Sequence, residues 1–197
     1  MSDASTDALP ALLLASTSRY RRELLGRLQL PFVCLAPGVD ESERAEEAPR
    51  DRARRLAEAK ARAVAVTHPA AAVIGSDQVC ECRGLVLDKP GTLARARQML
   101  DWMSGETVRF HTAVSLIHGR QHWHQVDRTV CRVRRLDAAA IDAYLAREPS
   151  LDTAGAFKIE GLGISLFSAV HSRDPSALIG LPLIWLSARL RRLRFPV

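Results

Sequence analysis

Residues 12–25, LLLASTSRYRRELL, combine an apolar run, a hydroxyl-rich turn and the start of an amphipathic helix. The first four predict a buried strand, residues 16–18 are helix-capping types, and a helix is expected over 19–28. A strand that leads into a helix N-terminus presents free backbone N–H groups and the positive end of the helix dipole, which favours a bound anion. Together with Arg21 and Arg22 the pattern suits a polyphosphate; the alternative is a capped helix with a solvated basic turn.

Strand-like and helix-like segments alternate along the rest of the chain. Strands are expected at 32–35 and 71–75, a small hairpin at 79–87, a long hairpin around Gly119 at 107–133, and helices at 50–66, 92–103, 137–147 and, after Pro175 and Pro182, up to about 193. This order favours an α/β or α+β architecture over a helical bundle or a β-sandwich. The polar loop at 37–49 is long enough to have a function.

The composition is that of an ordinary globular protein. The 197 residues are 47% hydrophobic and 25% charged, which excludes a disordered or fibrous chain and suits one domain or two lobes that share a core. The net charge of +6 favours anionic partners without separating nucleotides from nucleic acid.

The sequence predicts neither a membrane span nor a secretion signal. No run approaches the ~18 apolar residues of a span. The first residues lack a basic leader and carry Asp3 and Asp7, so a cytoplasmic location is expected. The four cysteines lack paired spacing and are expected to be reduced thiols without assigned chemistry.

Acidic residues and lysines mark a second candidate site. Asp77 follows the predicted strand 71–75, and the carboxyl ends of strands are where α/β proteins tend to bind ligands. Such a carboxylate could bind a metal or take a proton from water, and its alternative role is to form a turn. Asp40-Glu41 lies in the polar loop, where solvated charge is the alternative. Only three of the 28 basic residues are lysines, which suggests positions that arginine would not fit: Lys60, Lys89 and Lys158.

Two other clusters are given less weight. His122 and His124 would share one face of a strand, but no carboxylate or cysteine stands nearby at ligand spacing, so a metal site is not expected there. The C-terminal arginines lack the interleaved aromatic residues of a nucleic-acid module and are expected to be a solvated helix end: Arg189, Arg191, Arg192 and Arg194.

Taken in order, several motifs make the chain resemble the Maf family over residues 11–193. They are LLLASTSRYRRELLGRLQLPF, the loop at 39–42, Lys60 in its helix, IGSDQV, DKP, AGAFKIEGLGISLF and DPSALIGLPLIWL. Within the family the chain is similar to the YceF branch, the 7-methyl-GTP pyrophosphatases. The branch that acts on dTTP and UTP has Asp-Thr in place of Asp77-Gln78 and Ile-Gln-Gly in place of residues 159–161.

The resemblance implies an α/β fold related to inosine triphosphatases, with a mixed twisted sheet, flanking helices and two lobes around a cleft. It implies a flexible tail at 1–10 and a single domain at 11–197. The implied activity cleaves the α–β phosphoanhydride of 7-methyl-GTP to give 7-methyl-GMP and pyrophosphate, with Mg²⁺ or Mn²⁺ as cofactor.

The resemblance also assigns roles to individual residues. Asp77 is the expected proton acceptor and, with Glu41, the metal ligand, while Lys60 and Lys89 complete the catalytic set. Tyr20, Gln78 and Glu160 are expected to set substrate choice, within a substrate-binding group that also includes Ser16, Arg21, Arg22 and Lys158. The chain has Arg19 where the family often has proline, which should alter only the turn, and Asp88 where it often has glycine, beside Lys89.

The sequence leaves other functions open. The family is also associated with arrest of cell division, so a regulator that binds a nucleotide without turnover is one alternative, and a pyrophosphatase for other non-standard or pyrimidine triphosphates is another. Asp77, Glu41 and the lysines argue against a pure binder, which needs no carboxylate to activate water. Nucleic acid and membranes are not expected partners, and the sequence leaves homodimer formation open.

Overall fold

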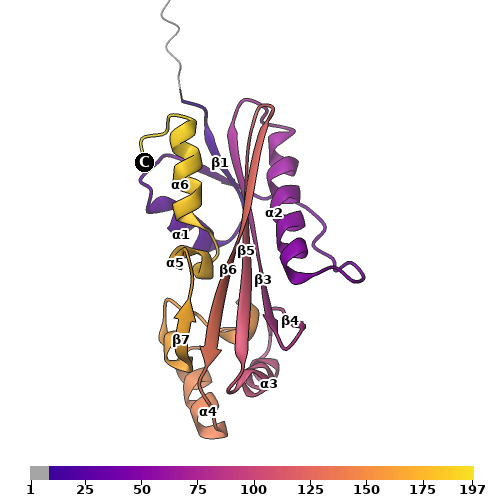
Figure 1. Ribbon diagram of the computed structural model, residues 1–197, viewed down its shortest axis with the longest axis vertical. Coiled ribbons are helices and arrows are strands. Elements are labelled where there is room, and N and C mark those ends of the chain that lie inside the picture. The colour runs from indigo at the N-terminus through magenta and orange to yellow at the C-terminus, as the bar shows by residue number, and fades with distance from the viewer. Residues whose placement is uncertain (1–8) are drawn as a thin grey trace, which may run out of the picture.

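The computed structural model describes residues 9–197, in which seven strands form one mixed sheet (Figure 1). The strand order is β2-β1-β3-β5-β6-β7, and β4 pairs with β3. β1 is parallel to β2 and β3, whereas β3, β5, β6 and β7 are each antiparallel to the next strand in the sheet. The strands are β1 (Leu12–Ala15), β2 (Val33–Leu35), β3 (Ala72–Cys82), β4 (Leu85–Leu87), β5 (Thr107–His118), β6 (Gln121–Val133) and β7 (Phe167–His171).

The helices begin close to the capping residues expected from the sequence. The side chains of Ser18, Thr92 and Asp137 each accept a hydrogen bond from a backbone N–H in the first turn of the helix that follows. The α-helices are α1 (Arg19–Gly26), α2 (Pro49–Ala65), α3 (Leu93–Met103), α4 (Ala138–Arg147), α5 (Pro175–Ile179) and α6 (Leu183–Arg192), with short 3₁₀ helices η1 (Ala154–Ala156) and η2 (Leu162–Leu166).

The hydrophobic core has its two largest parts toward opposite ends of the long strands. One contains Leu14 and Ile74 together with residues of α1 and α6; the other contains Cys80 and Phe157 with residues of α3 and α4. Figure 1 shows α1 and α6 in the upper half of the elongated molecule and α3 and α4 near its lower end. The long strands β3, β5 and β6 connect the two lobes, as expected for a two-lobed α/β fold.

One strand prediction was wrong in a way that matters for the site. A strand was expected to end at Gly75, with Asp77 at its tip, but β3 continues to Cys82 because Asp77 pairs with Ala113 of β5. The antiparallel ladder overrides the local turn preference of Ser76 and Asp77. The strand that ends at this level is β1, whose last pair with β3 joins Leu14 to Ile74.

The hairpins, the helix ends and the cysteines agree with the sequence predictions within the described residues. The two hairpins lie where they were expected, and the helix ends agree within about two residues of the expected positions. Eight of the ten residues of the expected tail, 1–8, lie outside the described residues. All four cysteines are free thiols. Among residues 9–197, no helix is long and apolar enough to cross a membrane.

Candidate active site

A cleft of about 850 Å³ opens where β1 ends and β3 runs on past it. The turn at 16–18 and the first residues of α1 form one wall, and the segment from Asp152 to Glu160 forms part of another. Nine residues that the sequence placed in the site line this cleft: Ser16, Tyr20, Arg21, Glu41, Lys60, Asp77, Gln78, Lys89 and Glu160. Arg22, which is exposed on α1, and Lys158 are not among the lining residues.

Lys60 joins the two carboxylates of the candidate catalytic group. Its Nζ lies 2.7 Å from Oδ1 of Asp77 and 2.8 Å from Oε1 of Glu41. Only 6% of the Lys60 side chain and 10% of the Asp77 side chain are exposed, whereas Glu41 is 56% exposed. A charge pair with so little contact with water interacts strongly, so Lys60 and Asp77 hold each other in one arrangement.

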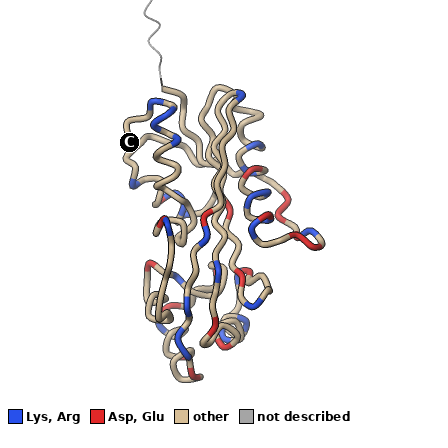
Figure 2. Tube along the Cα trace, in the orientation of Figure 1, with Lys and Arg blue, Asp and Glu red and all other residues tan. Residues whose placement is uncertain are grey.

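The loop that carries Glu41 is fastened to α2 by ion pairs. Arg55 donates two hydrogen bonds of 2.6 Å to the carboxylate of Glu47, and Arg52 Nη1 donates one to Glu43 at 2.7 Å. Figure 2 shows acidic stretches along the loop that precedes α2, beside the basic start of that helix. The two-pronged Arg55 contact fixes direction as well as distance, so the loop has a defined position next to Lys60.

Arg21 binds α1 to the segment after α5. Its Nε donates to the carbonyl of Gly180 at 3.0 Å, and the Ser76 hydroxyl is 2.9 Å from the same oxygen. Burial lowers the pKa of Arg21, while Asp77 and Glu41 act in the opposite direction. The guanidinium is thus placed in the cleft with other donors still available for an anionic ligand.

Gln78 uses its amide nitrogen to hold α5. Nε2 lies 2.9 Å from the hydroxyl of Thr112 and 3.0 Å from the carbonyls of Ala177 and Leu178. Thr112 in turn donates to Ala177 at 2.8 Å. Because the amide donors are already used, Gln78 would contribute to substrate choice through its amide oxygen or through the position of α5.

Tyr20 connects the two walls of the cleft. Its hydroxyl is 3.3 Å from Asp152, and the guanidinium of Arg19 lies 4.7 Å from its ring centre and 3.6 Å from Asp152. Lys158 adds a contact of 3.3 Å to Asp152. Burial lowers the pKa of Lys158, but hydrogen bonds with Tyr20 and Asp152 outweigh it and raise that pKa overall. The expectation that Arg19 alters only the turn was therefore wrong, because Arg19 contacts both Tyr20 and Asp152.

Glu160 is exposed on a loop held in place by Glu148. The Oε2 of Glu148 accepts from the backbone N–H of Gly163 at 3.0 Å. A Cβ on Gly161 would lie 2.1 Å from Oε1 of the same carboxylate, so a larger residue there would displace the Glu148 side chain. Tyr144 lies beside Glu148, and burial raises its pKa to about 12. The loop thus presents Glu160 to the cleft from a fixed base.

Lys89 lines the cleft from the segment after β4 and is exposed. The unusual neighbour Asp88 does not neutralise it directly, since the Asp88 carboxylate lies 3.7 Å from Nη2 of Arg52. Arg52 thereby connects Asp88 with Glu43 of the acidic loop. No ion pair of Lys89 is found among residues 9–197, so its ammonium group is available to a ligand.

The carboxylates of the cleft suit a magnesium-type ion. Glu41 and Asp77 converge on one Nζ, and each keeps a second carboxylate oxygen beyond that contact. Mg²⁺ is commonly held by one or two carboxylates together with substrate phosphates. The donors present therefore fit the divalent ion that the sequence led us to expect.

Some residues of the site carry no signal in the sequence. Asp152, Arg52 and Glu148 become relevant only through contacts between segments distant in the chain. Outside the cleft, Glu58 of α2 likewise has no signal in the sequence: it lies beside His122 and His124 and supplies the carboxylate that sequence spacing did not reveal.

The chain is similar to known proteins over nearly its whole length. A family model described as Maf-like protein matches residues 11–193. The chain is 57% identical over 187 residues to a protein of Xanthomonas oryzae pv. oryzae named 7-methyl-GTP pyrophosphatase, which covers 95% of this chain and 98% of that one. It is 53% identical over 184 residues to a protein of the same name from Bordetella pertussis, which covers 93% of this chain and 92% of that one.

Among solved structures, the chain is similar to a HAM1 protein from Coxiella burnetii. The TM-score is 0.49 at 13% identity, over 93% of this chain and 99% of that one. The family match spans nearly the whole described chain, including every element that lines the cleft. The chain therefore belongs to the Maf family.

Proposed function

We propose that this protein is a nucleoside triphosphate pyrophosphatase that cleaves the α–β phosphoanhydride of 7-methyl-GTP, releasing 7-methyl-GMP and pyrophosphate. The observation that carries the proposal is the convergence of Asp77, Lys60 and Glu41 in a cleft that Arg21 and Lys89 also line. The names of the relatives from Xanthomonas and Bordetella support the choice of substrate.

The cations of the cleft suit a triphosphate tail. Arg21 lines the cleft from α1 and Lys89 lines it from the segment after β4, and the turn at 16–18 adds the N-terminus of α1. Guanidinium, ammonium and backbone N–H groups are the usual partners of phosphate oxygens. In the reaction, Arg21, Lys60 and Lys89 would stabilise the negative charge that develops on the leaving pyrophosphate.

Asp77 is the group placed to act on water. In our proposal its carboxylate orients the attacking water and accepts its proton as the water adds to the α-phosphorus, and the bond to the bridging oxygen then breaks. Lys60 donates to Asp77 Oδ1 at 2.7 Å and so holds this side chain in place in the cleft. A bound Mg²⁺ or Mn²⁺ would add charge stabilisation on the phosphate oxygens and would be held by Glu41 and Asp77.

The base is expected to meet Glu160 and Tyr20. Guanine presents two adjacent donors, its N1–H and exocyclic amine, and one carboxylate can accept both. Methylation at N7 gives the base a positive charge, which an aromatic ring attracts. Since Arg19 already lies over the Tyr20 ring, the base would use the opposite face.

Replacing Glu160 with glutamine is expected to change substrate choice. Loss of a charge-assisted contact should lower kcat/KM for 7-methyl-GTP by about tenfold or more, with a smaller effect on UTP. Steady-state rates on both nucleotides measure the ratio. Asp101→Asn, a similar change at an exposed acid on α3 outside the cleft, is the control. An unchanged ratio in Glu160→Gln would remove Glu160 from base recognition.

The reaction itself is tested by product analysis. The protein is incubated with a panel of nucleotides and Mg²⁺ or Mn²⁺, and the products are identified by phosphorus NMR. Pyrophosphate from 7-methyl-GTP supports the proposal. Orthophosphate would show cleavage at the γ-phosphate instead, and binding without any product would favour a nucleotide-binding regulator.

Removing divalent ions should stop the reaction. Treatment with EDTA is expected to abolish turnover because the carboxylates at Glu41 and Asp77 would lack their ion, and excess Mg²⁺ or Mn²⁺ should restore it. Turnover is measured by release of pyrophosphate. Full activity in EDTA would contradict the metal requirement.

We also propose that the protein is cytoplasmic and that it has no membrane or nucleic-acid partner.

A further inference from the structure

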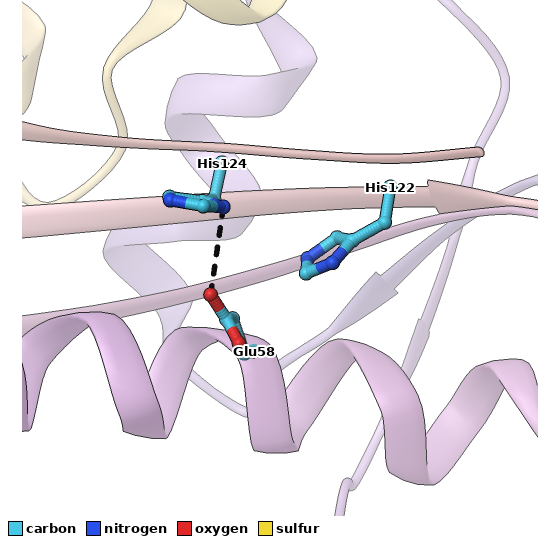
Figure 3. Close-up of side chains that lie close together, drawn as sticks. All are labelled: Glu58, His122 and His124. Carbon is cyan, nitrogen blue, oxygen red and sulfur yellow. Dashed lines mark ion pairs between the residues drawn. The ribbon is translucent and has the colours of Figure 1, made fainter.

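A second cluster of metal-ligating side chains lies outside the cleft. Glu58 of α2 faces His122 and His124 of β6, and one ligand atom from each lies within 4.8 Å of the others (Figure 3). Nδ1 of His124 is 3.5 Å from Oε1 of Glu58, and the imidazole centres are 5.7 Å apart. Two imidazoles and a carboxylate therefore converge from two different elements.

This cluster is separate from the candidate active site. None of its three residues lines the cleft. Glu58 stands two residues before Lys60 on α2, and residues at that spacing do not share a helix face. The donor sets also differ, because Glu41 and Asp77 offer oxygen alone whereas this cluster offers two nitrogens and one carboxylate.

We propose that Glu58, His122 and His124 form a binding site for a single transition-metal ion of the Zn²⁺ type, which ties α2 to β6. Imidazole suits Zn²⁺, Cu²⁺ and Ni²⁺, whereas Mg²⁺ prefers oxygen ligands and keeps several waters. Two histidines and one glutamate are a known ligand set for zinc, with the fourth position left to water. Mg²⁺ bound in the cleft would therefore not compete for this site.

To accept the ion, no two ligand atoms need to approach by more than about 1.4 Å, since all lie within 4.8 Å of one another. Ligand atoms around a tetrahedral Zn²⁺ stand about 3.4 Å apart, since Zn–N and Zn–O distances are near 2.0–2.1 Å. The His124–Glu58 separation is already 3.5 Å. His124 is 46% exposed, so its side chain can rotate without disturbing the core.

A second observation points to the same role for His122. Its Nε2 lies 2.9 Å from the hydroxyl of Ser115, which is fully buried in the neighbouring strand β5. Metal-ligating histidines usually donate a hydrogen bond to a second group through their other ring nitrogen, which fixes the orientation of the ring. When Nε2–H donates to Ser115, Nδ1 keeps its lone pair for an ion.

The test is a Zn²⁺ titration by calorimetry in excess Mg²⁺. The parent protein and every variant in this experiment carry Cys34→Ser, because Cys34 is a partly exposed thiol that could itself bind zinc. The parent is expected to bind one equivalent of Zn²⁺. Glu58→Gln and His124→Asn should each weaken binding at least about tenfold, since loss of a supporting residue alone has that effect. His171→Asn, which changes an exposed histidine on β7, should leave it unchanged.

Thermal unfolding gives an independent readout. Zn²⁺ should raise the melting temperature of the parent and of His171→Asn, because an ion that binds only the folded state stabilises it. The rise should be lost in Glu58→Gln and His124→Asn. Absence of Zn²⁺ binding in the parent would overturn the proposal. Binding that survives both substitutions and is lost in Asp77→Asn would also overturn it, by placing the ion in the cleft.

Discussion

Replacing Asp77 with asparagine should reduce turnover of 7-methyl-GTP by about 1,000-fold, the scale expected when a general base is removed. An amide cannot accept the proton of the attacking water. It still fits the space beside Lys60, which retains Glu41 at 2.8 Å as a charged partner. Substrate binding should therefore persist. The rate is measured as pyrophosphate release, and the affinity with an analogue that has a methylene group between the α- and β-phosphates.

Two comparisons make this result interpretable. Thermal unfolding of Asp77→Asn shows whether the nearly buried Lys60 tolerates the loss of one partner, since breaking such a pair can itself destabilise a protein. Asp101→Asn provides the matched change at an exposed acid on α3 and should retain full activity. A folded Asp77→Asn protein with near-normal turnover would exclude Asp77 as the base.

Local sequence patterns were enough to predict most of the fold. The capping residues Ser18, Thr92 and Asp137 mark helix starts that the structure confirms, and Gly119 marks the turn of the long hairpin. These features depend on neighbours in the chain. The end of the strand at Gly75 was misplaced because pairing of Asp77 with Ala113 is set by β5, more than thirty residues away.

The candidate site likewise has residues that the sequence identifies and contacts that it does not. The motifs identify Asp77, Lys60 and Glu41, and the structure brings them into contact. The contacts that position them are long-range and invisible to spacing: Asp152 meets Tyr20 across 132 residues, and Glu58 meets the histidines only because α2 lies along β6. A single sequence gives no measure of such contacts.

The crossing of α2 over β3 depends on the absence of a side chain at Gly75. A Cβ there would lie 2.2 Å from the carbonyl oxygen of Ala57 and 2.6 Å from the backbone nitrogen of Ala61. Both are backbone atoms of a helix, so neither can move alone. Glycine in a strand interior often marks such a close approach. The approach also sets the distance between Lys60 on α2 and Asp77 on β3.

Gly75→Ala should therefore affect stability and activity together. Forcing a methyl group against the backbone of α2 is expected to cost about 3 kcal/mol of unfolding free energy, which corresponds to a fall in melting temperature of roughly 10 °C. Moving α2 away would also lengthen the contact of Lys60 with Asp77, so kcat should fall even at temperatures where the variant is folded. Thermal unfolding and pyrophosphate release measure the two effects.

Gly26→Ala is the matched control, because a Cβ at that last residue of α1 meets no atom within 4 Å. Alanine is favoured over glycine in a helix, so this variant should be at least as stable as the parent and equally active. If Gly75→Ala had the same melting temperature and the same turnover as Gly26→Ala, the space between α2 and β3 would accommodate a methyl group. The contact with α2 would then not be what fixes Lys60 beside Asp77.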